Sequence, residues 1–229
     1  MVTPRSACPK CGTPIRARHN IPVISWLWLR GRCADCGAPI SLRYPLIELA
    51  VGLVFAVIVL ASGVRIETLL LLVFAAFSLI LAVIDFEVRR LPNAIVGPCV
   101  IAIAAVIVLA CAVSGDWGAA LRALLGALAV GALYGIAWLI YPAGLGFGDV
   151  KLAPVIGAFL AFFGWGVLVV GTLAGFVWGA CAGIVAMIAA RRMRKVAIPF
   201  GPWMFVGAWT GVLVGARAWQ WYVNDIVGL

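Results

Sequence analysis

Charged residues are scarce in this chain. Only 11% of its 229 residues are Asp, Glu, Lys or Arg, and the acids number just eight, against a hydrophobic content of 66%. The mean hydropathy of +1.17 is far above that of soluble globular domains. Disorder is also excluded, because disordered segments have low hydrophobicity, whereas the apolar residues here form blocks of membrane-spanning length. The composition therefore predicts a helical membrane protein with several spans.

Basic residues outnumber acidic ones, with 17 Lys and Arg against eight Asp and Glu, which gives a formal net charge of +9. In a soluble protein this excess would suggest a nucleic acid partner. In a membrane protein the same excess sets the orientation of the chain and contacts anionic lipid. We therefore expect membrane lipid as a partner and no nucleic acid.

Apolar segments separated by Gly, Pro or charged residues follow residue 44. They cover roughly residues 45–62, 66–84, 93–113, 118–141, 149–163, 166–190 and 199–217. Segment 149–163 is shorter than the about 20 residues that a spanning helix needs, and 199–217 opens with two prolines. Short or re-entrant segments are tolerated where they line a protein cavity. The predicted fold class is an all-α polytopic membrane protein with about seven transmembrane helices.

Lys and Arg are distributed unevenly between alternate loops. The residues before 44, the 85–92 loop, the 142–151 region and the 191–195 run together hold 14 of them, whereas the opposite side holds only Arg65, Arg122 and Arg217. Loops rich in Lys and Arg remain in the cytoplasm. We therefore expect the N-terminal region in the cytoplasm and, after an odd number of spans, the C-terminus outside.

Residues 1–43 form a predicted small polar domain ahead of a membrane domain at residues 44–229. Two C-x-x-C pairs, each followed by Gly, lie in it: Cys8, Cys11, Cys33 and Cys36. Each pair can bind one face of a tetrahedral ion, and both pairs together complete a closed structural zinc site. Disulfides are the alternative, but a cytoplasmic location disfavours them. We expect a zinc-ribbon-like module in which the metal supports folding rather than chemistry.

The few carboxylates can be considered one by one. Five lie in a knuckle, in loops or in the tail, where solvation accounts for them: Asp35, Glu67, Glu87, Asp116 and Asp225. Glu48 begins the first span, where a structural role as a cap or a partner of Arg43 accounts for it. Asp85 is different, because it ends a long apolar run at the C-terminus of a predicted helix, where the helix dipole disfavours negative charge. An ionisable group in such a position at the membrane edge is a candidate functional residue.

Asp149 follows Gly146-Phe147-Gly148 and opens the next predicted helix, so a simple N-cap is the alternative to a functional role. Asp85 and Asp149 both fall at cytoplasmic helix ends and can meet there. Two neighbouring carboxylates share a proton, which supplies one acid and one base to activate a water, as in aspartic proteases. The two glycines permit positive φ, and we expect them to leave room for an extended peptide to approach the acid.

Several motifs resemble those of the bacterial type IV prepilin peptidases, the leader peptidase/N-methyltransferases of type IV pilus and type II secretion systems. The segments 20–33 and 40–48 are similar to the cytoplasmic domain of that family. Asp85 with Leu91-Pro92-Asn93 resembles its first catalytic motif. Gly146-Phe-Gly-Asp-Val-Lys-Leu152 resembles its G-x-G-D motif, and Pro199-Phe-Gly-Pro202 its last conserved turn. The resemblance covers nearly the whole chain.

The resemblance implies an aspartic peptidase that cuts the short basic leader from prepilins and pseudopilins at the cytoplasmic face of the bacterial inner membrane. Asp85 and Asp149 match the catalytic pair of the family, and we expect Asp85 to act as the acid and Asp149 as the base. In many members the new N-terminus is then methylated from S-adenosylmethionine. A peptidase without methyltransferase activity is the alternative within the enzyme class. A proton-relaying transporter and a non-catalytic scaffold are the alternatives outside it.

One feature departs from the family pattern. Its members usually begin with a further transmembrane helix before the first C-x-x-C pair, whereas Met1 lies only seven residues ahead of Cys8. We therefore expect either that the start of the chain has been cut or mis-assigned, or that this is a seven-span variant; with the additional helix the total would be eight. Asn93 and His19 stand where Asp is frequent in the family, and neither belongs to the aspartate pair.

Overall fold

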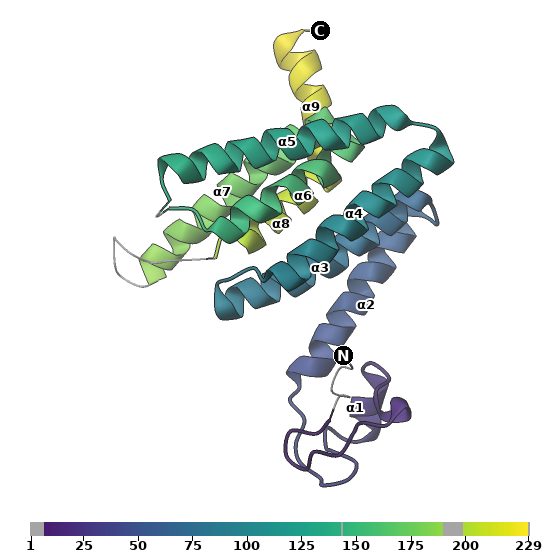
Figure 1. Cartoon of the computed structure of the whole chain (residues 1–229). Coiled ribbons are helices and arrows are strands. Elements are labelled where there is room, and N and C mark those ends of the chain that lie inside the picture. The colour runs from purple at the N-terminus through teal and green to yellow at the C-terminus, as the bar shows by residue number, and fades with distance from the viewer. Residues whose placement is uncertain (1–6, 143, 190–198, 229) are drawn as a thin grey trace. The chain divides into compact units, whose positions relative to one another are not determined.

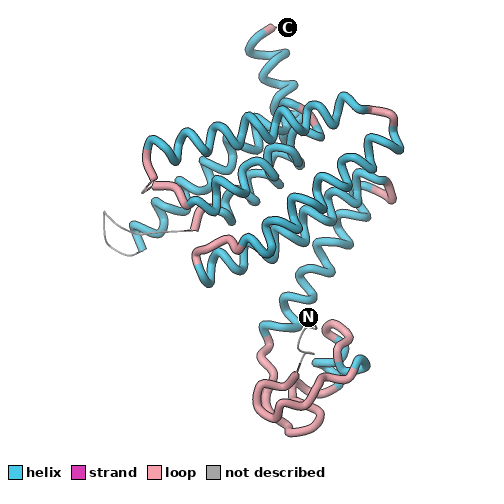
Figure 2. The backbone as a smooth tube through the Cα atoms, in the orientation of Figure 1, coloured by secondary structure: helices cyan, strands magenta, loops and turns pink. Residues whose placement is uncertain are grey.

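The structure is a computed structural model that describes residues 7–142, 144–189 and 199–228. The described residues form helices joined by loops and contain no strand (Figure 2). The chain divides into two compact units, Met1–Gly63 and Val64–Leu229. The predicted all-α class is confirmed. The basic run predicted at 191–195 lies outside the described residues.

The first unit contains the cysteine module and one long helix. The module carries a short 3-10 turn, η1 (Ala17–His19), and a short helix, α1 (Ile24–Trp28). The long helix α2 (Arg43–Ser62) is 20 residues of almost entirely apolar sequence. It ends at Gly63, whose φ of +71° stops the helix in a conformation that L side chains rarely adopt.

The second unit is a helical bundle (Figure 1). Its elements in chain order are α3 (Ile66–Val88), α4 (Asn93–Ser114), α5 (Trp117–Ile140), α6 (Phe147–Phe163), α7 (Trp165–Ala189), α8 (Gly201–Thr210), the π-helical η2 (Gly211–Gly215), α9 (Ala216–Trp221) and the π-helical η3 (Tyr222–Val227). The last four follow one another without a break. Each of the seven predicted apolar segments therefore corresponds to a helix at that position.

Five described helices are long and apolar enough to cross a membrane, namely α2, α3, α4, α5 and α7. Helix α6 has only 17 residues, a length of about 25 Å against a hydrocarbon core of about 30 Å. The last helical segment extends to Val227, ten residues beyond its predicted end at 217. The reason is that Arg217, Asn224 and Asp225 end the apolar run but do not break a helix.

Helix α6 forms the core of the second unit. Its side chains Leu152, Phe159 and Leu160 have no exposed surface, and it contacts α4, α5, α7 and α8. The Phe159 ring stacks on Phe74 of α3 with ring centroids 3.6 Å apart. Because most of α6 is enclosed by other helices, a length below the thickness of the hydrocarbon core is tolerated.

Small residues allow two helix pairs to approach closely. Helix α5 lies along α6, where Gly126 faces Gly157 so closely that a Cβ on either would clash with the backbone of the other. Helix α7 packs on α8 and η2 in the same way, with Gly207 against Gly175 and Gly211 against Gly171. Packing of this kind is typical of helices that associate in lipid.

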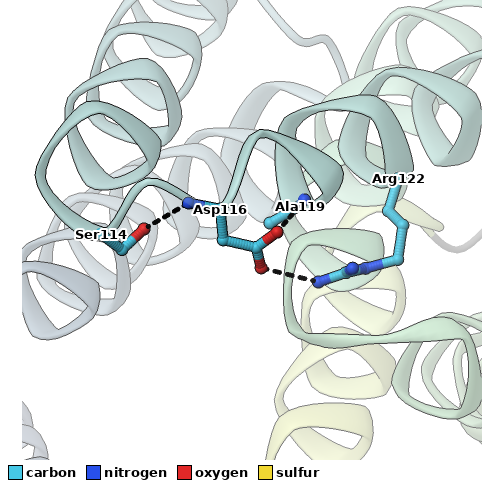
Figure 3. A network of polar contacts seen from close by, with 4 residues as sticks. All are labelled: Ser114, Asp116, Ala119 and Arg122. Carbon is cyan, nitrogen blue, oxygen red and sulfur yellow. Dashed lines mark hydrogen bonds and ion pairs between the residues drawn. The ribbon is translucent and has the colours of Figure 1, made fainter.

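The connection between α4 and α5 is fixed by a helix cap. Asp116 accepts a hydrogen bond from the Ala119 backbone N–H at 3.1 Å and forms a 3.6 Å ion pair with Arg122 (Figure 3). The Ser114 hydroxyl accepts from the Asp116 backbone N–H at 3.3 Å. Asp116, expected to be merely solvated, is thus the N-cap of α5, and its role is structural.

Candidate active site and metal site

Asp85 lies in the last turn of α3, as predicted from the end of the apolar run. The Arg89 N–H closes the helix by donating to the Asp85 carbonyl, and Arg89 then turns the chain with a left-handed φ of +53°. The side chain of Asp85 is only 5% exposed. Its Oδ2 atom is buried and has no hydrogen-bond partner among the described residues. A buried polar oxygen left in this state is costly for folding, which points to a chemical role.

Asp149 lies in the first turn of α6, with 6% exposure. It is not the N-cap, because that position is occupied by Gly146. As the third helical residue, Asp149 reaches back toward the backbone of Gly146, which is the geometry of a capping box. The N-terminal end of the helix dipole favours a negative charge here. Asp149 is therefore a carboxylate of the first helical turn and not the N-cap of α6.

The two aspartates meet beside Gly201, the first residue of α8. A Cβ placed on Gly201 would lie 2.7 Å from Oδ2 of Asp85 and 3.6 Å from Oδ1 of Asp149. The two carboxylate oxygens are therefore no farther apart than the sum of these distances. The two groups also interact electrostatically. Carboxyls from the third and sixth helices are thus brought together against a glycine backbone.

A cleft of about 430 Å³ opens onto this pair. Its walls come from the end of α3 and the following loop, the beginning of α6, and the two residues that precede α8. Three basic side chains line it: Arg89, Arg90 and Lys151. The Lys151 ammonium donates to Oδ1 of Asn93 at 2.8 Å and lies 4.7 Å from the centre of the Phe147 ring. The cleft is large enough to admit a segment of a ligand.

The glycines of the G-x-G-D motif do not use the positive φ that glycine permits. Gly146 has a φ of −69°, and Gly148 lies in α6 without a positive φ. What they provide is space. A Cβ on Gly146 would lie 3.1 Å from Oδ2 of Asp149, and one on Gly148 would lie 3.2 Å from Cβ of Leu91. The expected room beside Asp149 is therefore present, without a left-handed backbone.

Two residues near the pair were not predicted from the sequence. Gly201 belongs to the Pro199–Pro202 turn, which resembled a family motif without indicating a role. Tyr134 of α5 is 2% exposed, interacts electrostatically with Asp149, and stacks on Phe176 of α7. A Tyr in an apolar helix gives no sequence signal, because its partners come from other helices.

The cysteine module contains two knuckles of the same form. In each, the N–H of the first Cys donates to the backbone carbonyl of the residue five positions later. The N–H of the Gly that follows the second Cys donates to the backbone carbonyl of the first Cys. Gly12 and Gly37 adopt φ of +71° and +68°. Isolated antiparallel bridges, Ala7 with Pro14 and Arg32 with Pro39, close the two turns. Here the glycines do provide the tight turn that the spacing predicts.

The four thiols of Cys8, Cys11, Cys33 and Cys36 converge, with every sulfur within 4.8 Å of every other. The Cys8 and Cys36 sulfur atoms, from different knuckles, are 3.8 Å apart. A tetrahedral ion with Zn–S bonds of about 2.3 Å requires sulfur atoms about 3.8 Å apart. The cluster can therefore hold a metal ion. No disulfide joins the described cysteines.

Hydrogen bonds from the side chain and backbone of Thr13 lower the pKa of the Cys11 thiol to about 6. The thiolate is the ligand form, so this shift favours metal binding at Cys11, whereas the pKa of the Cys36 thiol in the same cluster is raised to about 12. The remaining described cysteines lie apart in helices, Cys99 and Cys111 in α4 and Cys181 in α7. They contribute nothing to the cluster.

Comparisons with known proteins agree across nearly the whole chain. A profile of the bacterial peptidase A24 N-terminal domain matches residues 1–62, and one of the type IV leader peptidase family matches residues 72–188. No solved structure matched the chain.

Curated proteins named prepilin leader peptidase/N-methyltransferase are similar over most of their own length. The protein from Aeromonas hydrophila is 35% identical over 243 residues, which cover 99% of this chain and 77% of that protein. The one from Pseudomonas putida is 36% identical, with 93% and 73% covered. The one from Burkholderia pseudomallei (strain K96243) is 37% identical, with 90% and 66% covered. With both profiles matched and these identities, the chain belongs to the type IV leader peptidase family.

Proposed function

We propose that this protein is a membrane aspartic endopeptidase that removes the leader peptide from type IV prepilins or pseudopilins, with Asp85 and Asp149 as its catalytic pair. The observation that carries the proposal is the meeting of two nearly fully buried carboxyls beside Gly201, at the base of a cleft. Family membership and the relatives' name supply the substrate class.

The proposed chemistry gives the two carboxyls different roles, because they lie at opposite ends of their helices. Asp149, at a helix N-terminus, is the anion that removes a proton from water, and Asp85, at a helix C-terminus, holds the shared proton. The resulting hydroxide adds to the scissile carbonyl carbon while Asp85 protonates the carbonyl oxygen. Asp149 then returns its proton to the departing amine, and Asp85 takes one from the tetrahedral intermediate. The C–N bond breaks, and the pair returns to its starting state.

The geometry favours this chemistry over a proton-relaying transporter. A transporter needs carboxyls along a path through the membrane, whereas the two buried aspartates among the described residues lie together at one end of the bundle and face a cleft. The cleft also has the size of a ligand site. A non-catalytic scaffold would not require two buried carboxyls in contact with the same backbone position.

We propose zinc as the ion of the four-cysteine cluster, because four thiolates in tetrahedral geometry are typical of structural zinc. The four cysteines would hold the ion, which would stabilise the fold of the module and take no part in cleavage. The N-terminal module would lie in the cytoplasm and the protein in the bacterial inner membrane. The 14 to 3 distribution of Lys and Arg between the two sides supports this orientation.

The relatives' name also supports N-methylation of the new pilin N-terminus, with S-adenosylmethionine as the expected methyl donor. We assign no residue of this chain to that reaction, and a peptidase without it is the alternative. Mass spectrometry of a pilin recovered from cells that carry this protein as their sole prepilin peptidase separates these outcomes. We expect a pilin that lacks its leader and carries one methyl group more than the unmethylated mature chain. An unmethylated mature pilin would show that the protein is a peptidase without methyltransferase activity, and an intact leader would overturn the proposal.

A further inference from the structure

The short helix α1 of the cysteine module presents a bare apolar face. Ile24, Leu27 and Trp28 follow the i, i+3, i+4 spacing of one helix face, and their side chains are 59%, 63% and 67% exposed. Ile21, one turn earlier, is 45% exposed and extends the face. A small polar domain in water would not be expected to leave this many large apolar side chains together and uncovered.

The opposite side of α1 is firmly attached to the module. Ser25 is buried, accepts from the Ile21 N–H at 2.9 Å and donates to the Arg18 carbonyl at 3.2 Å. The Trp26 indole N–H donates to the Ile40 carbonyl at 3.1 Å. The helix therefore cannot rotate to bury its outer face without breaking these bonds, and the apolar residues remain directed outward.

A hydrogen bond places α1 at a defined depth relative to the membrane. The Val23 N–H, immediately before α1, donates to Oε2 of Glu48 in α2 at 2.7 Å. Glu48 lies five residues into α2, about 7.5 Å along its axis, and the 20 residues of α2 measure about 30 Å, the thickness of the hydrocarbon core. Helix α1 is thus attached within the first two turns of a helix long enough to span the membrane, close to one face of the bilayer.

The charges around this face match an anionic surface. Arg18, Arg30 and Arg32 flank α1 and are exposed. Asp35 is the only acid among the first 42 residues, and it pairs with Arg16 at 3.3 Å. Apolar side chains with a Trp, flanked by basic residues, are the composition of helices that lie in the membrane interface.

We infer that α1 is a second membrane-contacting surface, distinct from the spanning helices, which docks the cysteine module on anionic phospholipid through Ile24, Leu27 and Trp28. Docking would hold the module against the bilayer surface instead of leaving it free on a single helical tether. The inference depends on α2 crossing the membrane and not on the peptidase activity.

The test uses the full-length protein in nanodiscs without any substrate. The photo-crosslinking residue p-benzoylphenylalanine replaces Trp28 in one sample and Lys10, an exposed residue of the first knuckle, in a control. After illumination, intact-mass analysis should show a phospholipid adduct several-fold more abundant at position 28 than at position 10. An adduct between position 28 and protein, equal yields at both positions, or no adduct would overturn the inference.

Amide hydrogen exchange of residues 21–30 tests the charge component with unlabelled protein. We expect slower exchange in nanodiscs that contain phosphatidylglycerol than in nanodiscs of phosphatidylcholine alone. Leu27→Asp, a change at an exposed position, should abolish the difference while the zinc content stays the same. Equal exchange in both lipids would contradict docking on anionic phospholipid. Because neither measurement requires cleavage, a result that contradicts docking would leave the proposed function untouched.

Discussion

At the residue scale, Gly201 determines how closely the two aspartates can meet. Both carboxyls lie beside the position that a Cβ would take on Gly201, and the space that a side chain would occupy is taken by Oδ2 of Asp85. Its backbone N–H also interacts with the Asp85 carboxyl. The absence of a side chain at this position is therefore part of the proposed active site.

Gly201→Ala should reduce leader cleavage by on the order of 100-fold, because a displacement of about 1 Å at a reacting group has this effect. The added Cβ would lie 2.7 Å from Oδ2 of Asp85 and would push the carboxyl away from its partner. Gly135→Ala in α5 is the matched control, since a Cβ there meets nothing within 4 Å. Cleavage rates of both variants at equal protein amounts check this expectation. Wild-type activity in Gly201→Ala would show that the geometry beside Gly201 is unimportant.

The aspartates themselves could be predicted from the sequence, but the residues and backbone conformation around them could not. Asp85 was identified by its position at the end of an apolar run, and Asp149 by the adjacent glycines; both are buried as a functional pair requires. Gly201 carries no signal of its own, because its importance comes from the side chains of two other helices. The φ of Gly146 could not be predicted either, since glycine permits positive φ without requiring it.

At the element scale, helix α8 positions Gly201 through its close packing on α7. Gly207 of α8 lies against the backbone of Gly175, and Gly211 follows against Gly171. The interface leaves no room for side chains, so it fixes the distance between the two helices. A shift of α8 would move Gly201 away from the aspartates.

Gly207→Leu should destabilise the bundle by about 1–3 kcal/mol or more, because overpacking a close contact costs this much and its Cβ would overlap the Gly175 backbone. Leader cleavage should fall as well, as α8 is displaced. Gly97→Leu in α4 serves as control, since nothing lies within 4 Å of a Cβ there. Thermal unfolding in detergent is the measurement. Equal melting temperatures for the two variants would contradict the packing of α7 on α8.

The elements could be located from hydropathy because each apolar segment is bounded by Gly, Pro or charge. The lengths of two of these elements could not be predicted from hydropathy. Helix α6 is short because it is enclosed by other helices, which composition does not reveal, and its first turn is set by Gly146 rather than by Asp149. The last segment continues past Arg217, because a charged residue ends an apolar run without ending a helix.

At the scale of the whole molecule, the metal cluster and the aspartate pair belong to different compact units. The four cysteines lie in Met1–Gly63, and both aspartates lie in Val64–Leu229. The division implies that a metal bound by the cysteines would stabilise one unit, whereas helix packing stabilises the other.

Chelation of the metal should therefore unfold the cysteine module alone. We expect release of one zinc per chain and rapid proteolysis within residues 7–42, while the thermal unfolding of the helical bundle stays the same. Cys33→Ser should behave like the chelated protein, and Cys181→Ser, a change at a separate exposed thiol in α7, like the wild type. A bundle that unfolds at a lower temperature after chelation would show that the units are not independent in stability.

The central claim is that Asp85 and Asp149 together perform the cleavage. The most direct measurement is the rate of leader removal from a purified prepilin by the full-length protein in nanodiscs, for Asp85→Asn, Asp149→Asn and the control Asp225→Asn, an exposed carboxylate of η3. The expected result is loss of cleavage in each of the first two variants, with amounts and melting temperatures like those of the wild type, and full cleavage by the control. Cleavage that persists in either Asp85→Asn or Asp149→Asn would contradict the account and remove that residue from the mechanism.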